Sequence, residues 1–403
     1  MSGRKMNNPN QYSEEQLRNI VIQELTNSGW RFENDQFIPP IATNKQDIRN
    51  SHKYQRLERA SGESKLLNKF RGNLLKEFAE GNEIDPFHFQ PELIEVDSKS
   101  PDNNLFRFAT FLWSVPVSHG YGRRMRYIIR DAYNGKLMGI FALMDPVFNL
   151  KVRDKVIGWN SNQRKNRLYN MMDAYILGAM PPYNYLLGGK MVALSTVSDQ
   201  IRQAFHRKYS GTLPVWGKKE KDASLVLITT TSALGRSSIY NRIQLPGERC
   251  KVFQSMGYSG GWGHFHISDN TFNLLRDWLR GQGDTYADKH QYGDGPNWRL
   301  RTIRQAFDKL GFIGDSLKHG IQREVFLAPL AINFAEFLRG ETNTPFYLSR
   351  DIQDLALYFR DRWMIPRSSR NAEWCNWRRE DTWDRIAANL DLHPINGQQY
   401  SLF

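Results

Sequence analysis

Hydrophobic and polar positions follow two different periods along the chain, and these periods predict both helices and strands. Near the N-terminus, residues 13–16 have the form of a capping box, and the apolar residues after them recur at helical spacing. A second apolar stripe at helical spacing runs from Leu66 to Phe78. Prolines and polar residues between 86 and 104 indicate a linker. Residues 1–104 are therefore expected to form a mainly helical region that ends in a linker.

The middle of the chain adds the pattern of strands. Residues 125–133 and 136–144 are rich in β-forming residues, and the Asn134-Gly135 pair between them is a strong hairpin signal. The apolar run 225–230 predicts a buried strand. Helices are expected over 164–177, 190–209 and 237–243. Because strands and helices are interspersed, residues 105–280 are predicted to form a central mixed α/β domain.

The last part of the chain returns to helical spacing. Helices are expected over 300–310, with Gly311 as a C-cap, and over 325–338 and 352–363. The predicted fold class is thus α/β (α+β), with a central mixed sheet flanked by two helical regions. The second of these, 281–403, ends in a tail rich in Trp and Arg.

Composition narrows the class of protein. With 40% hydrophobic and 13% aromatic residues, the 403-residue chain is globular and cannot be disordered. The 55 Lys and Arg exceed the 42 Asp and Glu by thirteen charges, which suits nucleic acid, an anionic membrane or mere solubility. Two cysteines exclude a disulfide framework, and no Cys-x-x-Cys pair suggests zinc, so no metal is expected. Without a signal sequence or an apolar run of about 18 residues, we expect a cytoplasmic protein with no membrane contact.

The basic residues are densest between positions 151 and 167, where aromatic residues lie among them. Cations and aromatic rings in one surface would bind phosphates and stack on bases. An ordinary solvated helix surface gives the same pattern, so both interpretations stay open. The candidate nucleic-acid-binding residues are Lys151, Arg153, Lys155, Arg164, Lys165, Arg167 and Trp159.

Four residues are candidates for catalysis. Asp145 and Asp154 follow a predicted strand, in the kind of loop that often carries chemistry, and either carboxylate could accept a proton. Tyr240 and His264 are the further candidates. The alternatives are a local turn at Asp145, an ion pair at Asp154, and a structural histidine at 264 that points to the same side of a strand as His266.

A glycine turn after the predicted strand 225–230 is a candidate anion site. Backbone N–H groups at the start of a helix bind anions, and nearby cations would add to that attraction. An ordinary strand–turn–helix cap uses the same residue types. The candidate anion-binding residues are Arg236, Ser237, Ser238 and Arg242.

Several of these segments, taken in order, resemble the DruA family of the Druantia anti-phage defence system. The matching segments include Asp145–Leu150 with Arg153-Asp154, Leu234–Arg242, Gly261–His266, His319–Phe326 and Arg362–Arg367. The resemblance implies a component of a multi-subunit bacterial defence system that works beside a large helicase-like protein and other Druantia subunits. The charge pattern adds DNA as an expected partner. The resemblance assigns no catalytic residues.

The middle domain is also similar, in the order of its elements, to the GNAT acyltransferase fold. The Gly-Gly turn at 188–189 would then hold the pyrophosphate of acyl-CoA, but Lys190 and Met191 stand where that motif requires Gly or Ala. No cofactor is therefore expected, although an acyl-CoA-type ligand is compatible with such a fold. Three functions stay open: a nucleic-acid-binding subunit, an acyltransferase-like enzyme that modifies nucleic acid or protein, or a scaffold whose tail and helices only assemble the complex.

Overall fold

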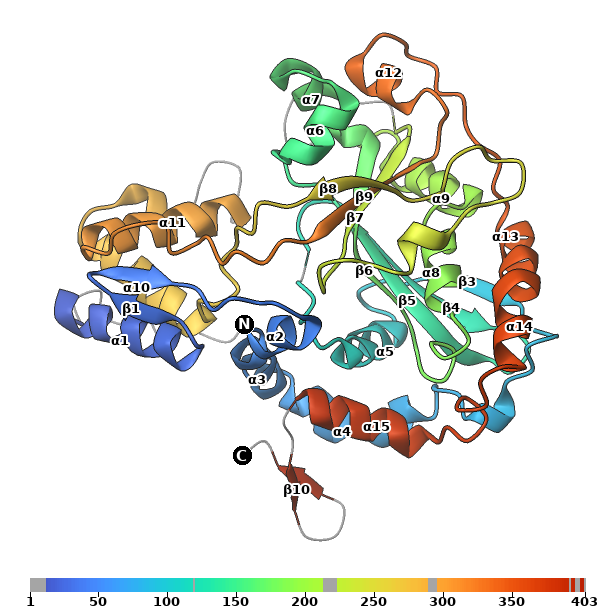
Figure 1. Cartoon of the computed structure of the whole chain (residues 1–403), viewed down its shortest axis with the longest axis horizontal. Helices are drawn as coiled ribbons and strands as arrows, with labels where there is room; N and C mark the ends of the chain where they lie inside the picture. Colours follow the sequence, from blue (N-terminus) through green and yellow to red (C-terminus); the bar gives the residue numbers. More distant parts are fainter. Residues whose placement is uncertain are drawn as a thin grey trace. The chain divides into compact units, whose positions relative to one another are not determined.

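A mixed sheet of seven strands organises the larger part of the chain (Figure 1). The computed structural model describes residues 12–118, 120–212, 223–288, 296–390, 393–395 and 399–401. The strands of the sheet are β3 (Pro91–Glu95), β4 (Arg124–Asp131), β5 (Lys136–Met144), β6 (Met171–Ala179), β7 (Leu227–Thr231), β8 (Gln254–Tyr258) and β9 (Glu324–Pro329). Their order is β3-β4-β5-β6-β7-β9-β8, and every neighbouring pair is antiparallel except β6 and β7.

The hairpin of β4 and β5 forms where the sequence places Asn134-Gly135. Gly135 has a φ of 70°, a left-handed conformation that glycine adopts without strain. The side-chain oxygen of Asn134 accepts a hydrogen bond of 2.9 Å from the backbone N–H of Lys136 and closes the turn. The hairpin predicted from the sequence is confirmed, and so is the buried strand at β7.

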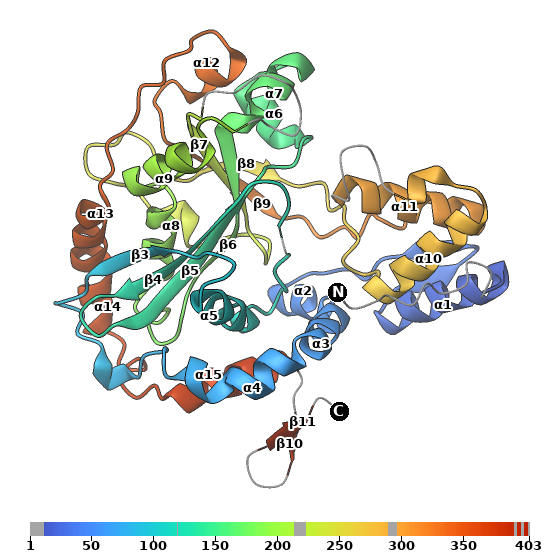
Figure 2. The ribbon, with the colours of Figure 1, turned by 180° about the vertical axis from the view of Figure 1, so that it is seen from behind.

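Alternate residues of the central strands point to opposite faces of the sheet, and helices cover each face (Figure 2). In β4, Tyr127 and Ile129 belong to one buried cluster, whereas Ile128 between them belongs to the other. The first face is covered by α8 (Gly189–Ser195), α9 (Asp199–Tyr209) and α13 (Ile352–Phe359). The second is covered by α4 (Ser64–Leu75), α5 (Asp102–Ala109) and α15 (Arg379–Asn389).

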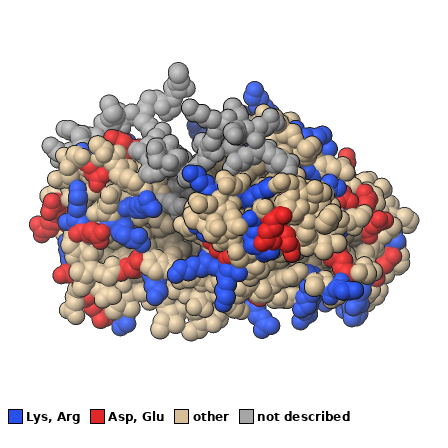
Figure 3. All heavy atoms as spheres, turned by 90° about the horizontal axis from the view of Figure 1, so that it is seen from above, with Lys and Arg blue, Asp and Glu red and all other residues tan. Residues whose placement is uncertain are grey.

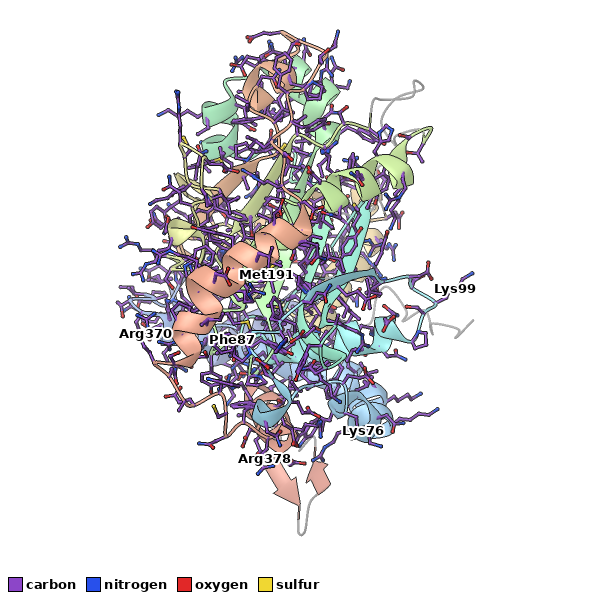
Figure 4. All side chains as sticks on the ribbon, turned by 90° about the vertical axis from the view of Figure 1, so that its right-hand side faces the viewer. Lys76, Phe87, Lys99, Met191, Arg370 and Arg378 are labelled. Atoms are coloured by element: carbon purple, nitrogen blue, oxygen red, sulfur yellow. The ribbon has the colours of Figure 1, made fainter. Side chains whose placement is uncertain are left out.

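Shorter elements complete this part of the chain. α6 (Lys151–Ile157) and α12 (Phe334–Arg339) pack against the ends of β6, β7 and β9, and α7 (Ser161–Arg167) contacts α12. α13 continues through the π-helical turn η6 (Arg360–Met364) into α14 (Ile365–Ser368), beside Met191 of α8 (Figure 4). The remaining elements are the 3-10 turns η1 (Gly81–Glu83), η2 (Thr110–Leu112), η3 (Leu168–Asn170) and η4 (Tyr240–Arg242), and the hairpin strands β10 (His393–Ile395) and β11 (Gln399–Ser401).

Residues 1–59 and 260–322 belong to a second compact unit. Its elements are α1 (Glu14–Asn27), β1 (Arg31–Glu33), β2 (Gln36–Ile38), α2 (Lys45–Asn50), most of α3 (Lys53–Gly62), α10 (Asp269–Gly281), η5 (Thr285–Ala287) and α11 (Pro296–Lys309). Apolar residues of α1, α10 and α11 form its core. The predicted capping box is confirmed: Ser13 Oγ accepts from the backbone N–H of Gln16 at 3.2 Å, and Gln16 Oε1 accepts from that of Ser13 at 2.8 Å.

Residues 260–322 are inserted between β8 and β9. The compact units therefore do not follow the consecutive stretches 1–104, 105–280 and 281–403 that the sequence suggests. β8 and β9 pair antiparallel and would form a simple hairpin without the insertion. The backbone N–H of Ser259 donates to the carbonyl of Arg323 at 2.8 Å, so the chain leaves and re-enters this pair of strands at adjacent points.

Three predicted helices are wrong in part. Residues 237–243 form only the 3-10 turn η4 within a loop. Residues 164–177 form the end of α7 and then β6, and residues 325–338 form β9 and then α12. Both strands have neighbours on each side and helices over the sheet, so the alternating pattern of a half-exposed strand is lost. The stretch 86–104 is also not simply a linker, because it contains the edge strand β3, which pairs with β4.

The mixed α/β class predicted from the sequence is confirmed by this arrangement. The GNAT-like character of the sheet stays a prediction. Within the described ranges, no helix has both the length and the hydropathy that crossing a membrane requires.

Gly139 of β5 provides a test of the packing between the sheet and α8. A Cβ added at Gly139 would lie 2.5 Å from Cγ2 of Val192, so Gly139→Ala should lower the free energy of unfolding by about 1–3 kcal/mol. A Cβ at Gly72 in α4 meets nothing within 4 Å, so Gly72→Ala should raise that free energy by up to about 1 kcal/mol. Urea unfolding measures both changes in the free energy of unfolding. If both substitutions changed it in the same direction, the close approach of Val192 of α8 to Gly139 would be contradicted.

Candidate functional site

The carboxylate of Asp154 joins the loop after β5 to α6 and α7. Its Oδ1 accepts hydrogen bonds from Arg153 Nη2 at 2.7 Å and from the indole N–H of Trp159 at 2.9 Å. Its Oδ2 accepts from Arg164 Nη1 at 2.9 Å and from the backbone N–H of Leu150 at 3.2 Å. Both carboxylate oxygens accept hydrogen bonds from groups of the protein. Asp154 therefore holds this loop and the two helices together, and it is not a free general base.

Arg153 is the buried partner of Asp154, with 0% of its side chain exposed. Its guanidinium also donates to the carbonyls of Val147 at 2.6 Å and Phe148 at 2.8 Å. Burial lowers the pKa of Arg153, and the charge of Asp154 opposes that shift. Neither Arg153 nor the buried ring of Trp159 faces solvent, so their expected contacts with nucleic acid are replaced by contacts inside the protein.

The other cations of the predicted basic run divide into inner arginines and outer lysines. Arg164 lies 4.6 Å from the ring centre of Phe148, and Arg167 lies 4.6 Å from that of Phe337. Figure 3 views the molecule from the side on which α6 and α7 lie, where groups of Lys and Arg alternate with smaller groups of Asp and Glu. The exposed members, which we call the lysine surface, are Lys151, Lys155 and Lys165.

Asp145 directly follows β5 and pairs with Arg123. The backbone N–H and the Nε of Arg123 each donate to one oxygen of this carboxylate at 2.8 Å. The guanidinium of Arg123 lies 3.8 Å from the ring centre of Tyr169 and donates to the Tyr169 carbonyl at 2.8 Å. Asp145 thus fixes the segment that leads into β4 while its side chain stays partly exposed.

The turn predicted to bind an anion already has a carboxylate of the protein beside it. Oε2 of Glu324, a buried residue at the start of β9, accepts from the backbone N–H of Ser237 at 3.3 Å and from Nδ2 of Asn241 at 3.4 Å. An anion from outside would have to displace Glu324 from the N–H group of Ser237. The other predicted anion-binding residues, Arg236, Ser238 and Arg242, are exposed.

The side chain of Ile239 lies beside the turn at Gly188-Gly189. A Cβ added at Gly189 would lie 3.2 Å from Cδ1 of Ile239. Lys190 next to it is buried, and burial together with the charge of Arg242 lowers its pKa to about 8. Its Nζ donates to the carbonyl of Ile239 at 3.4 Å. An acyl-CoA-type pyrophosphate that approached Gly189 would therefore meet the side chain of Ile239.

Asp173 of β6 is an acidic residue that the sequence motifs do not single out. Its Oδ1 accepts a hydrogen bond of 2.7 Å from the hydroxyl of Thr229 across the parallel pair of β6 and β7. Burial raises the pKa of Asp173 to about 6, although the Thr229 hydroxyl and the charge of Arg153 lower it. A carboxyl group that titrates near neutral pH suits general acid–base chemistry. The available signal was one charged residue within an otherwise apolar run at 171–177.

Two tyrosines share the electrostatic environment of Asp173. The hydroxyl of Tyr121 is buried and has no hydrogen-bond partner among the residues that the structure describes. Burial raises the pKa of Tyr121, and the charges of Asp173 and Asp145 add to the shift. Burial also raises the pKa of Tyr240 to about 12, with a smaller contribution from Asp173. Of the candidates chosen from the sequence, Tyr240 therefore lies in the electrostatic surroundings of Asp173, and Asp145 lies in those of Tyr121.

His264 belongs to the second compact unit. Burial lowers its pKa to about 4, and burial lowers that of His266 to about 3. Nε2 of His266 lies 2.9 Å from the carbonyl of Ser316, to which the neutral tautomer donates. Both rings are neutral at pH 7, which suits structural histidines better than a pair that exchanges protons at that pH.

Two comparisons with known proteins agree with each other. The sequence model of a family described as Druantia protein DruA matches residues 42–340. Over 378 residues the chain is 45% identical to Druantia protein DruA of Escherichia coli (strain UMEA 4076-1), an alignment that covers 93% of this chain and 92% of that protein. No solved structure matches the chain. The residues of the lysine surface, Tyr121 and Asp173 all lie within the range that the family model matches.

Asp173→Asn tests whether this carboxyl group titrates near pH 6. Its pKa rises from 3.8 to about 6 on folding, so the folded state binds more protons between those values and stability falls as the pH rises through them. Asparagine keeps the acceptor for Thr229 and carries no charge. At pH 7.5 the substitution should raise the free energy of unfolding by about 2–3 kcal/mol, and the gain should disappear below about pH 4.

Urea unfolding at a series of pH values measures this difference. Asp97→Asn, which makes the same substitution in an exposed loop, is the matched control. The same pH profile in both variants would contradict the raised pKa of Asp173.

Proposed function

The chain belongs to the DruA family of Druantia proteins, and on that premise we propose that it acts in anti-phage defence as a nucleic-acid-binding subunit. In this proposal it works with other Druantia subunits, among them a large helicase-like protein, and DNA is its polyanionic partner. The lysine surface is the observation that carries the proposal.

The lysine surface suits a phosphate backbone because its scaffold is already fixed. Lys151 and Lys155 lie on α6 and Lys165 lies on α7, and Asp154 ties both helices together through Arg153 and Arg164. Lysines on such a scaffold approach phosphates without first ordering a loop. The nearby carboxylate of Asp154 is bound to arginines, so it competes little for the lysines. Phosphate contacts of this kind give affinity without sequence preference.

Replacing the three lysines with glutamine should weaken DNA binding and reduce its dependence on salt. Each lysine that neutralises a phosphate of duplex DNA contributes about 0.9 to the slope of log affinity against log salt, so the triple variant should show a slope smaller by about 2 to 3. Fluorescence anisotropy of the full chain with a labelled duplex between about 50 and 200 mM salt measures both quantities.

A triple variant of equal charge change is the control. Lys76, Lys99 and Lys251 are exposed in the same compact unit, and Figure 4 shows Lys76 and Lys99 pointing outward. Their replacement by glutamine should alter the slope far less. Equal effects in both triple variants would mean that only net charge matters, and no effect in the first would remove the proposal.

A second function is supported by the carboxyl group of Asp173 and the hydroxyl of Tyr121. Here the protein is an acyltransferase-like enzyme that modifies nucleic acid or protein in the same defence system. A carboxylate with a pKa of about 6 can accept a proton from an attacking amine or hydroxyl. The buried hydroxyl of Tyr121, which forms no hydrogen bond within the described ranges, is free to donate to a reacting oxygen.

Tyr121→Phe separates this second function from a purely structural role. Removing a buried hydroxyl without a partner should leave the free energy of unfolding unchanged or slightly higher. If the hydroxyl takes part in chemistry, protection of cells in a plaque assay should still fall by about tenfold or more. Tyr133→Phe, at an exposed ring, is the matched control. Full protection by Tyr121→Phe and by Asp173→Asn would exclude the enzymatic function.

A further inference from the structure

Trp262 is a large aromatic side chain that stays half exposed, at 50%, in the second compact unit. We infer that Trp262, together with Arg301, Arg304 and Lys318, forms a platform on which a base of single-stranded nucleic acid stacks. This site goes beyond the proposed function, because all four residues lie in the compact unit that does not contain the lysine surface.

The loop that carries Trp262 is held by backbone contacts. The carbonyl of Gly261 accepts from the N–H of Gly320 at 3.1 Å, and the N–H of Gly263 donates to the carbonyl of Leu317 at 3.0 Å. Gly261 has a φ of 70°, and a Cβ there would lie 2.8 Å from the carbonyl carbon of Gly320. Two segments of backbone therefore pack together at a distance that only glycine permits. The loop that carries the exposed indole is therefore held in place by contacts between backbone groups.

A third glycine determines how the indole lies. A Cβ added at Gly260 would lie 3.0 Å from Cδ1 of Trp262 and 3.2 Å from its Nε1. The ring thus rests over a residue without a side chain, and about half of its surface stays open to solvent. An indole supported on one side and open on the other has the geometry that base stacking requires.

Two cations lie beside the ring, and a third lies nearby on the same helix as one of them. The guanidinium of Arg304 lies 6.0 Å from the centre of the indole. Lys318 is exposed and is the antiparallel bridge partner of Trp262, which puts the two side chains on the same side of the bridge. Arg301 is exposed one turn before Arg304 on α11. Asp315 forms a long ion pair with Arg304, with 3.5 Å between Oδ2 and Nη2. Because this contact is long, the surroundings of the ring stay cationic.

An open indole next to cations favours single-stranded nucleic acid over an acidic protein segment as the ligand. A base offers a flat face to the indole, and the phosphates on either side of it meet cations around the ring. In duplex DNA the bases are stacked on one another and their faces are closed to a side chain. The platform should therefore prefer single strands, whereas phosphate contacts at the lysine surface alone would not require open bases.

The experiment compares the binding of the full chain to a labelled 20-nucleotide oligothymidine and to a 20-base-pair duplex. Trp262→Ala should weaken binding to the single strand about tenfold or more and change duplex binding less than about threefold. Trp262→Phe keeps an aromatic face and should restore most of the single-strand affinity. Tyr54→Ala removes a ring that is 49% exposed in the same compact unit and is the matched control.

Unchanged single-strand binding by Trp262→Ala, or an equal decrease with Tyr54→Ala, would overturn the inference. A decrease that appears with a polyglutamate peptide but not with oligothymidine would assign the platform to an acidic protein partner and would overturn it as well. If the lysine-surface variant fails to affect duplex binding while Trp262→Ala still weakens single-strand binding, the proposed function fails and this inference stands.

Discussion

The parallel pairing of β6 with β7 is the constraint on which the larger compact unit depends. Antiparallel neighbours can be joined by tight turns, but a parallel pair requires a long crossover connection. The chain builds this crossover with α8 and α9, whose apolar side chains fill one face of the sheet. The register of the pair also sets Asp173 directly opposite Thr229. A carboxyl group of raised pKa is thereby held between two central strands, where its position cannot drift as it would in a loop.

Two acidic side chains of the candidate site accept hydrogen bonds from donors of the protein itself. Asp154 accepts hydrogen bonds from two arginines and an indole, and Glu324 accepts one from the backbone N–H of Ser237. Arginine suits such inner positions because its planar guanidinium makes several directed hydrogen bonds, whereas lysine is a strongly hydrated point charge. The net charge of +13 counts the arginines near α6 and α7, but these arginines contact other groups of the protein. The positive charge that this surface exposes to solvent comes from its lysines.

The sequence was most informative where a local signal decides local structure. The capping box at Ser13 and the turn at Asn134-Gly135 form as expected because both depend on residues a few positions apart. β6 was mistaken for a helix because a strand covered on both faces loses its alternating pattern. In the candidate site, spacing places Asp145 and Asp154 in a loop and leaves an ion pair at Asp154 open, but it cannot identify which arginines pair with the two carboxylates. Asp173 was missed because its pKa depends on burial among strands distant in sequence.

The hydrogen bond between Ser259 and Arg323 bears on how the chain could have been assembled in evolution. The two ends of the inserted segment lie next to each other in a pair of strands that is complete without it. A gene that lost this segment would still encode all seven strands in the same order. The inserted segment shares its core with residues 1–59, so these two stretches of the second compact unit can vary together in a lineage under pressure from changing viruses while the order of strands in the sheet is kept.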